Sequence, residues 1–146
     1  MTLCIFASGF VKSKLWFEDP VIKFMEMIKY RSCVKNIVYN GNINGLISTI
    51  YTESLKYKIP VTQNSASYDI NCDFYIALPG GLGTIYQMTR VIYGGNPILI
   101  YNIDGFYNNF IDYLEEIQAF EMIDSELIKN VKIVSTLAEI EEWLKK

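Results

Sequence analysis

The chain reads Asp73-Phe74-Tyr75-Ile76-Ala77-Leu78-Pro79-Gly80-Gly81-Leu82-Gly83-Thr84 across the stretch that decides its fold. Its first half is mostly apolar and predicts a buried strand, which ends at Pro79. Closely spaced glycines follow, and helical periodicity resumes after them. Glycines permit a sharp turn and the close approach of a ligand, and the start of the next helix directs unpaired N–H groups and its positive dipole end at an anion. Residues 79–84, the glycine turn, therefore suit a phosphate.

Similar patterns along the rest of the chain predict alternating strands and helices. The expected strands are 2–7, 36–39, 59–62, 73–78, 97–101 and 131–134. The expected helices are 18–30, which has Pro20 in its first turn, 46–57, 85–93, 106–117 and 136–146. This alternation indicates an α/β fold, a three-layer sandwich with a mainly parallel sheet and right-handed crossovers. We expect the strand order 3-2-1-4-5, with the last strand added at the far edge.

This strand order brings three loops together. The first strand lies between the second and the fourth, so a crevice opens at the carboxyl ends of these strands, where the winding direction reverses. The loops at this crevice are the turn Ser8-Gly9, the loop 40–45, in which every residue but Ile43 is Asn or Gly, and the glycine turn. Topology and glycine placement thus predict the same ligand site.

The composition limits the range of functions. A chain of 146 residues, about half of them hydrophobic, predicts one domain spanning 1–146. The net charge of −3 and the absence of a basic run argue against nucleic acid or a membrane surface as a partner. The absence of histidine removes the usual general base and the usual metal ligand.

Two further features bear on the cellular compartment. Cys4, Cys33 and Cys72 fit neither a disulfide framework nor a thiolate metal site, so we expect them to be free and buried. Leu3 to Val11 is as apolar as the core of a signal peptide, but no basic residue precedes it, so we expect a first strand. No stretch has membrane-spanning length, and the protein is expected to be cytoplasmic.

Four segments resemble the LOG (LONELY GUY) family, in the order in which that family has them. Pro79–Gln87 is similar to the motif PGGxGTxxE, and Asp73–Leu78 to the strand that precedes it. Val38–Leu46 is similar to the loop VYGGGxxGLMG, and Tyr101–Asn108 to the segment LLNxDGYYN. The resemblance implies a Rossmann-like domain, often a homodimer, that hydrolyses the N-glycosidic bond of a nucleoside 5′-monophosphate, releases ribose 5-phosphate and needs no cofactor. The best known substrates of the family are cytokinin nucleotides.

The chain departs from the family pattern at two places. Gln87 stands where the motif has glutamate, and an amide neither carries negative charge nor accepts a proton at neutral pH. The family's glutamate works with an arginine from a segment MHxRK before the glycine turn, and residues 63–72 contain no arginine. About ten extended residues reach roughly 33 Å, which recrosses the sheet but leaves no length for a helix. We therefore expect a bare connection there and assign no catalytic residue.

Ten residues are predicted to bind the ligand: Ser8, Gly9, Gly41, Asn42, Gly45, Gly80, Gly81, Gly83, Thr84 and Gln87. The alternatives are a tight turn in which Thr84 caps the helix and, for loop 40–45, an ordinary Asn/Gly turn. Asp104 is expected to be the turn residue of an Asp-Gly loop. Tyr86 could stack on a base or pack against a partner subunit, and Arg90, one helical turn later, could meet a phosphate.

Three functions remain open. The two departures favour a binding protein that holds a nucleotide or a related phosphorylated ligand and lacks standard phosphoribohydrolase activity. The alternative is an active nucleoside 5′-monophosphate phosphoribohydrolase with a rearranged site, in which Asp104, Asp73 or a carboxylate of a partner chain does the chemistry. The third is a structural subunit that pairs through the helix after the glycine turn.

Overall fold

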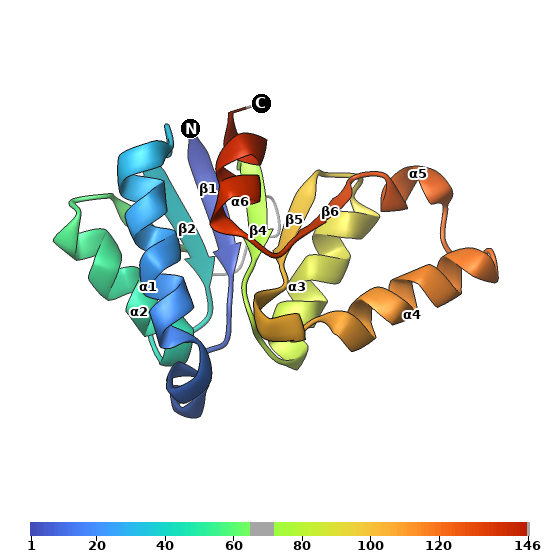
Figure 1. Ribbon diagram of the computed structural model, residues 1–146, viewed down its shortest axis with the longest axis horizontal. Coiled ribbons are helices and arrows are strands. Elements are labelled where there is room, and N and C mark those ends of the chain that lie inside the picture. Colours follow the sequence, from blue (N-terminus) through green and yellow to red (C-terminus); the bar gives the residue numbers. More distant parts are fainter. Residues whose placement is uncertain (65–71, 146) are drawn as a thin grey trace.

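The computed structural model describes residues 1–64 and 72–145, which form alternating strands and helices (Figure 1). The strands are β1 (Thr2–Phe6), β2 (Asn36–Asn40), β3 (Val61–Asn64), β4 (Phe74–Ala77), β5 (Ile98–Tyr101) and β6 (Val131–Val134). The α-helices are α1 (Lys14–Arg31), α2 (Gly45–Lys56), α3 (Leu82–Tyr93), α4 (Asn108–Ala119), α5 (Ser125–Ile128) and α6 (Leu137–Leu144). Short 3₁₀ helices are η1 (Val11–Ser13) and η2 (Ile103–Gly105).

The strands form one parallel sheet in the order β3-β2-β1-β4-β5-β6. This arrangement confirms the predicted α/β fold and strand order. Cys4 of β1 lies opposite Val38 of β2 on one side and opposite Tyr75 of β4 on the other. The winding direction therefore reverses between β1 and β4, and the carboxyl ends of the strands point downward in Figure 1.

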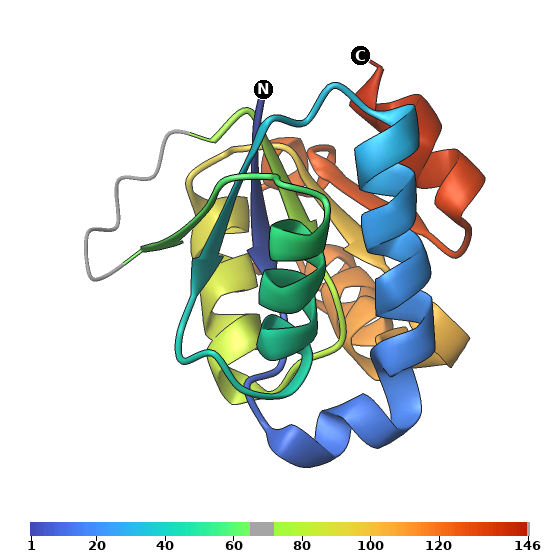
Figure 2. The ribbon, with the colours of Figure 1, turned by 90° about the vertical axis from the view of Figure 1, so that its left-hand side faces the viewer.

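Helices cover both faces of the sheet. Helices α1, α2 and α6 pack on one face, and α3 and α4 pack on the other (Figures 1 and 2). Strand β1 shows how the sequence encodes both layers, since Leu3 and Ile5 join the core under α1 and α2, while Cys4 and Phe6 join the core under α3. Such two-sided burial explains why the central strands β1, β4 and β5 are nearly continuous apolar runs.

The first helix is longer than its periodicity predicts. The sequence places its start near residue 18 with Pro20 in the first turn, but α1 begins at Lys14 and contains Pro20 in its interior. Leu15 and Trp16 are 79% and 75% exposed, so they do not continue the apolar period that marks the buried part of the helix. Pro20 removes only one helical hydrogen bond, the one that its missing N–H would give to the carbonyl of Trp16.

Other boundaries differ in smaller ways. Strand β3 begins at Val61 rather than at Ile59, and Pro60 directly precedes it on the edge of the sheet, as the proline requires. Helix α5 was not predicted because it is only one turn long. The three cysteines were predicted to be free and buried. Cys4 is buried, but Cys33 is exposed and Cys72 is half-buried, so the prediction of burial is confirmed only for Cys4. Within the described residues, every helix is too short or too polar to cross a bilayer.

Candidate functional site

The carboxyl ends of β1, β2 and β4 surround a hollow of about 210 Å³, which we call the glycine hollow. The described residues that line it are Phe6, Ala7, Ser8, Gly9, Phe10, Asn40, Gly41, Asn42, Gly81, Gly83, Thr84 and Gln87. Eight of the ten residues predicted to bind a ligand are among them. Gly45 and Gly80 do not line it, and Phe6, Ala7, Phe10 and Asn40 are lining residues that the sequence did not single out.

Ser8 connects the glycine turn to the start of α2. Its N–H donates to the carbonyl of Pro79 at 2.9 Å, which extends the pairing of β1 and β4 into the glycine turn. Its carbonyl accepts from the N–H of Ile47 in α2 at 3.3 Å, and its hydroxyl oxygen accepts from the N–H of Phe10 at 3.1 Å. The Ser8 hydroxyl still has its own proton to donate to a ligand.

Gly80 is required by the packing of Thr84. A Cβ atom on Gly80 would lie 2.0 Å from the Thr84 hydroxyl oxygen, because the buried Thr84 side chain occupies the space beside the turn. The residue at the helix N-cap is Gly81, and no side chain caps the helix there. Thr84 therefore lies in the first turn of α3, and the alternative in which it caps the helix is wrong.

Gly45 packs against the main chain of Phe10, a residue that lines the hollow. Its φ angle is +58°, and a Cβ atom would lie 2.3 Å from the carbonyl oxygen of Phe10. The start of α2 therefore packs directly against the main chain that follows β1. Only glycine allows both this conformation and this approach.

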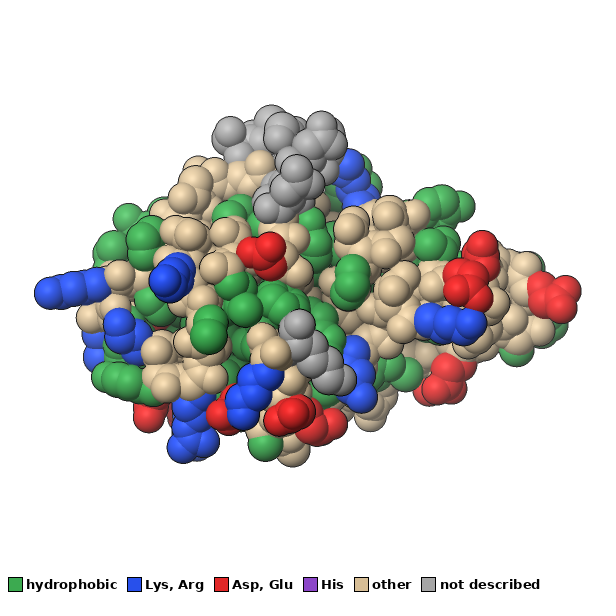
Figure 3. Space-filling view, turned by 90° about the horizontal axis from the view of Figure 1, so that it is seen from above, with side chains coloured by type: hydrophobic (Ala, Val, Ile, Leu, Met, Phe, Trp, Pro, Cys, Tyr) green, Lys and Arg blue, Asp and Glu red, His purple; other side chains and the backbone are tan. Residues whose placement is uncertain are grey.

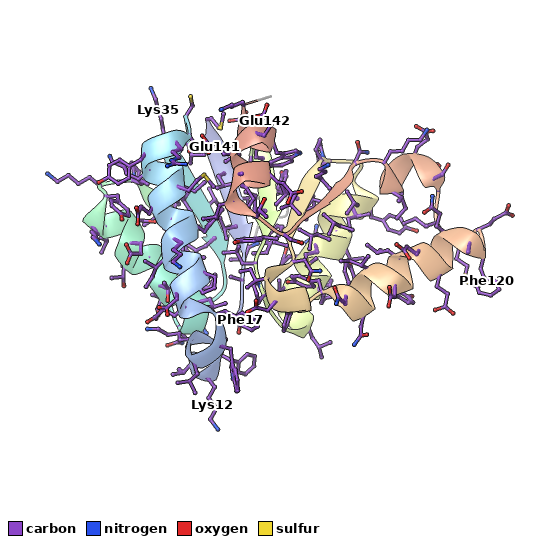
Figure 4. The ribbon with its side chains drawn as sticks, viewed as in Figure 1. Lys12, Phe17, Lys35, Phe120, Glu141 and Glu142 are labelled. Atoms are coloured by element: carbon purple, nitrogen blue, oxygen red, sulfur yellow. The ribbon has the colours of Figure 1, made fainter. Side chains whose placement is uncertain are left out.

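The start of α3 gives the hollow its electrostatic character. Gly81, Gly83 and Thr84 belong to the N-cap and first turn, where helical N–H groups lack intrahelical partners and the helix dipole is positive. The described lining residues include no Lys, Arg, Asp or Glu. The nearby Lys12, in η1, points away from the molecule (Figure 4). An anion in the hollow would therefore be held by main-chain N–H groups and uncharged side chains.

The carboxylates considered for catalysis lie elsewhere. Asp73 precedes β4 at the opposite end of the sheet, where its Oδ2 accepts from the N–H of Thr2 at 2.8 Å. Asp104 is exposed, has a φ angle of +52° and lines a different hollow, of about 310 Å³, together with Lys23 and Ser135. Its conformation is that of the predicted turn residue. Gln87, which is half-buried, therefore brings a neutral amide to the glycine hollow with neither of these carboxylates beside it.

Tyr107 is a supporting residue that the sequence did not reveal. Its side chain is 1% exposed, and its hydroxyl donates to the carbonyl of Leu78, directly before the glycine turn. Asn102 fixes this segment, since its Oδ1 accepts from the N–H of Tyr107 at 2.7 Å and its Nδ2 donates to Oδ1 of Asn108 at 2.8 Å. Burial raises the pKa of Tyr107, which keeps the phenol neutral and able to donate. The signal was present in the segment 101–108, which resembles a LOG motif.

Arg90 and Tyr86 interact with each other rather than with the hollow. The Arg90 guanidinium lies over the Tyr86 ring, 5.8 Å from its centroid. Arg90 follows Gly81 by nine residues, or about 13 Å along a helix. Arg90 does not line the glycine hollow, and its contact with a phosphate stays a prediction.

One prediction falls on a part of the chain that the structure does not describe. The bare connection expected over 63–72 includes residues 65–71, which lie outside the described residues. Gln63 is in β3, and its Nε2 donates to the carbonyl of Gly41 at 2.7 Å. This bond ties the edge strand to the Asn/Gly loop of the hollow.

Comparison with known proteins gives one consistent group of relatives. No protein-family model matches the chain. The cytokinin riboside 5′-monophosphate phosphoribohydrolase LOG4 of Arabidopsis thaliana is 32% identical over 147 residues, which cover 78% of this chain and 67% of that protein. The probable cytokinin riboside 5′-monophosphate phosphoribohydrolase LOGL6 of Oryza sativa subsp. japonica is 22% identical over 173 residues. That match covers 97% of this chain and 69% of that protein.

A solved structure supports the fold independently. The molybdenum cofactor carrier protein of Chlamydomonas reinhardtii superposes with a TM-score of 0.66 at 10% sequence identity. The match covers 99% of this chain and 95% of the carrier protein. Similarity at this identity extends to the arrangement of strands and helices alone.

Proposed function

Because the chain belongs to the LOG family of cytokinin riboside 5′-monophosphate phosphoribohydrolases, we propose that it binds a nucleotide or a related phosphorylated ligand at the glycine turn. The observation that carries this proposal is the glycine hollow, where the start of α3 meets the loops after β1 and β2. A phosphate there would accept hydrogen bonds from the first N–H groups of α3 and from the hydroxyls of Ser8 and Thr84. The amides of Asn42 and Gln87 are available to the sugar hydroxyls.

The described lining of this site lacks the charged groups that glycosidic hydrolysis needs. The transition state resembles an oxocarbenium ion, which a carboxylate stabilises while it assists the attacking water. Gln87 occupies the position of the family's glutamate, and no described lining residue is acidic. We therefore propose that the protein binds its ligand and does not hydrolyse it at the rate of its relatives.

Pairing of two copies is part of this proposal. Leu82 and Tyr86, four residues apart on one face of α3, are 90% and 54% exposed. Large exposed apolar side chains in one stripe are typical of an interface. We assign Leu82 and Tyr86 to a homodimer contact, which lies beside the glycine hollow, and we propose that the whole chain 1–146 acts as one cytoplasmic domain in each subunit.

The experiment measures binding and turnover on the same samples. Purified protein is incubated with a panel of nucleoside 5′-monophosphates, including a cytokinin riboside 5′-monophosphate; free base is followed by chromatography and binding by calorimetry. We expect binding without base release, and a Thr84→Val variant about tenfold weaker in binding, since it loses a hydroxyl bond to a charged group. Thr89→Val, on the same helix but outside the glycine hollow, is the matched control and should bind normally.

Other outcomes would replace the proposal. Base release by the wild type would show an active hydrolase, and its loss on monomerisation by the uncharged variant Leu82→Ser, with ligand binding retained, would show that the partner subunit supplies the missing group. Neither binding nor release would leave a structural role for the protein.

Restoring the family's glutamate should not restore catalysis. We expect Gln87→Glu to release no base from any monophosphate of the panel, because the arginine of the family's second motif is absent from residues 63–72. The added negative charge should also weaken binding of an anionic ligand. Chromatography of the reaction products checks this, and base release by the single variant would show that the arginine segment is dispensable.

A further inference from the structure

A second hollow, of about 640 Å³, lies between α3 and α4 on the other side of the molecule from β3. We call it the α3–α4 groove. It is lined by Thr89, Ile92, Tyr93, Phe110, Tyr113, Leu114, Ile117, Glu121, Met122, Ile123, Asp124 and Leu127. In Figure 1 helix α4 extends away from α3 toward the end of the molecule that carries α5. The groove is thus separate from the glycine hollow, with which it shares no lining residue.

The groove is apolar, and part of its lining faces solvent. Tyr93, Tyr113 and Met122 line it and are 76%, 57% and 76% exposed. Leu114 and Ile92, which are buried, form its floor. An apolar surface of this kind, bordered by polar residues, is typical of a binding site for another protein segment.

The charge around the groove is mainly negative. Residues 102–128 contain seven acidic residues and no Lys or Arg: Asp104, Asp112, Glu115, Glu116, Glu121, Asp124 and Glu126. The rest of the chain holds all 13 basic residues and nine acidic ones. Glu121 and Asp124 line the groove itself, while Glu126 pairs with Lys129 at 2.7 Å. Figure 3 shows several acidic side chains, with a basic side chain among them, at the end of the molecule that carries α4 and α5.

The apolar lining and the acidic residues together restrict which kind of partner can bind in the groove. Two copies that paired through the groove about a two-fold axis would place the same acidic border against itself, and like charges across an interface are unfavourable. A partner with an apolar stripe and flanking basic residues would instead fill the floor and meet Glu121 and Asp124 at the edge. Helix α4 has 12 residues, about 18 Å, so a helical segment of about three turns matches the groove in length.

We propose that the α3–α4 groove binds a basic amphipathic helix of a partner protein. The apolar face of that helix packs between Tyr93, Tyr113 and Met122, as in other helix-in-groove complexes. Its Lys or Arg side chains lie against the acidic border, which makes binding weaker at high salt. The site acts independently of the glycine hollow, so a failure of either proposal leaves the other intact.

The experiment uses synthetic peptides and the full-length protein. The probe is a labelled peptide of about 14 residues, built from Leu and Lys so that Leu recurs with helical period, and binding is followed by fluorescence anisotropy. One control peptide has the same composition in an order that breaks the period, and another replaces Lys by Glu. We expect only the periodic Leu–Lys peptide to bind tightly.

Variants of the protein locate the binding. Tyr113→Ser, Met122→Ser and the double change Glu121→Lys with Asp124→Lys should each weaken binding at least about tenfold. Phe120→Ser is the matched control, because Phe120 is 68% exposed at the far end of α4 and does not line the groove (Figure 4). Circular dichroism checks that each variant folds.

Three results would overturn the proposal. Equal binding of the scrambled Leu–Lys peptide would mean that charge alone attracts the probe. Unchanged binding by the groove variants would place the peptide elsewhere. A wild-type dimer that sedimentation shows to dissociate in Met122→Ser would make the groove a contact between copies of this chain.

Discussion

The two hollows of this protein are built from different parts of the chain. The glycine hollow is lined by loop main chain, glycines and uncharged polar side chains at the ends of three strands. The α3–α4 groove is lined by aromatic and aliphatic side chains from helices, with Glu121 and Asp124 at its edge. The shape of the first depends on how closely main-chain segments approach one another, and the shape of the second depends on which side chains the helices leave exposed.

This difference has consequences for mutation. Beside the glycine hollow, a methyl group added at Gly45 or Gly80 would meet main chain or a buried side chain, so it should cost both stability and binding. In the α3–α4 groove the exposed side chains contribute little to the core, so their removal should cost binding alone. Substitutions at three positions test this contrast, in decreasing order of their expected effect on the free energy of unfolding.

The largest effect is expected at Gly45. An alanine there would hold an unfavourable positive φ angle, and its Cβ would lie 2.3 Å from the carbonyl oxygen of Phe10, which is main chain and cannot move aside alone. Strain and overpacking together should lower the free energy of unfolding by about 3 kcal/mol. Urea denaturation measures it, and binding of the nucleotide panel should weaken because Phe10 lines the hollow.

The control for this prediction is Gly41→Ala. Gly41 also has a positive φ angle, +91°, but nothing lies within 4 Å of the position that a Cβ atom would take there. Its substitution should cost only the conformational term, about 1 kcal/mol. Equal losses at the two glycines would show that the contact between Gly45 and Phe10 is unimportant and that the hollow is less dependent on main-chain packing than its geometry indicates.

The main-chain requirements that mark the residues predicted to bind a ligand are local. Glycine and proline at 79–84 mark where a strand ends. The alternation of strand-like and helix-like apolar patterns along the chain predicts the order of the strands in the sheet. Thr136 and Glu139, three residues apart at the start of α6, form another local arrangement: the Thr136 hydroxyl accepts from the N–H of Glu139 at 3.3 Å and donates to Glu139 Oε1 at 2.9 Å. Eight of the predicted ligand residues therefore line one hollow.

Features that depend on distant residues could not be predicted in this way. The hydrogen bond from Tyr107 to Leu78 joins residues 29 positions apart, and the resemblance of segment 101–108 to a LOG motif does not name this partner. Gly80 and Gly45 are predicted as ligand contacts because sequence does not distinguish a glycine that faces a ligand from one that makes room for Thr84 or Phe10. The α3–α4 groove was missed because its lining has the same helical period as a buried face.

Tyr107→Phe tests the hydrogen bond to the residue before the glycine turn. Its expected effect on the free energy of unfolding is intermediate. The change leaves the buried Leu78 carbonyl without its donor, which should cost about 1.5 kcal/mol. Tyr113→Phe, whose ring is exposed in the groove, is the control and should be neutral. An unchanged free energy of unfolding in Tyr107→Phe would mean that the glycine turn keeps its conformation without this bond.

The pH dependence of stability provides a second check on Tyr107. Its pKa is raised in the folded state from the usual 10.0, because burial disfavours the phenolate. The contribution of Tyr107 to the free energy of unfolding is therefore fully present below about pH 10. It is lost as the pH rises further, with a slope of about 1.4 kcal/mol per pH unit. Tyr39, Tyr75 and Tyr101 also have raised pKa values, so the wild type should lose stability above pH 10 and Tyr107→Phe should lose it less steeply.

The smallest effect is expected in the α3–α4 groove. Met122→Ser removes a side chain that is 76% exposed and lies outside both apolar cores, so the free energy of unfolding should change by no more than about 0.5 kcal/mol. Binding of the periodic Leu–Lys peptide should nevertheless fall. Urea denaturation and anisotropy on the same preparation measure the two quantities together. A large loss of stability would mean that Met122 helps hold α4 against α3, and the contrast between a groove made for a partner and a hollow made by the main chain would then fail.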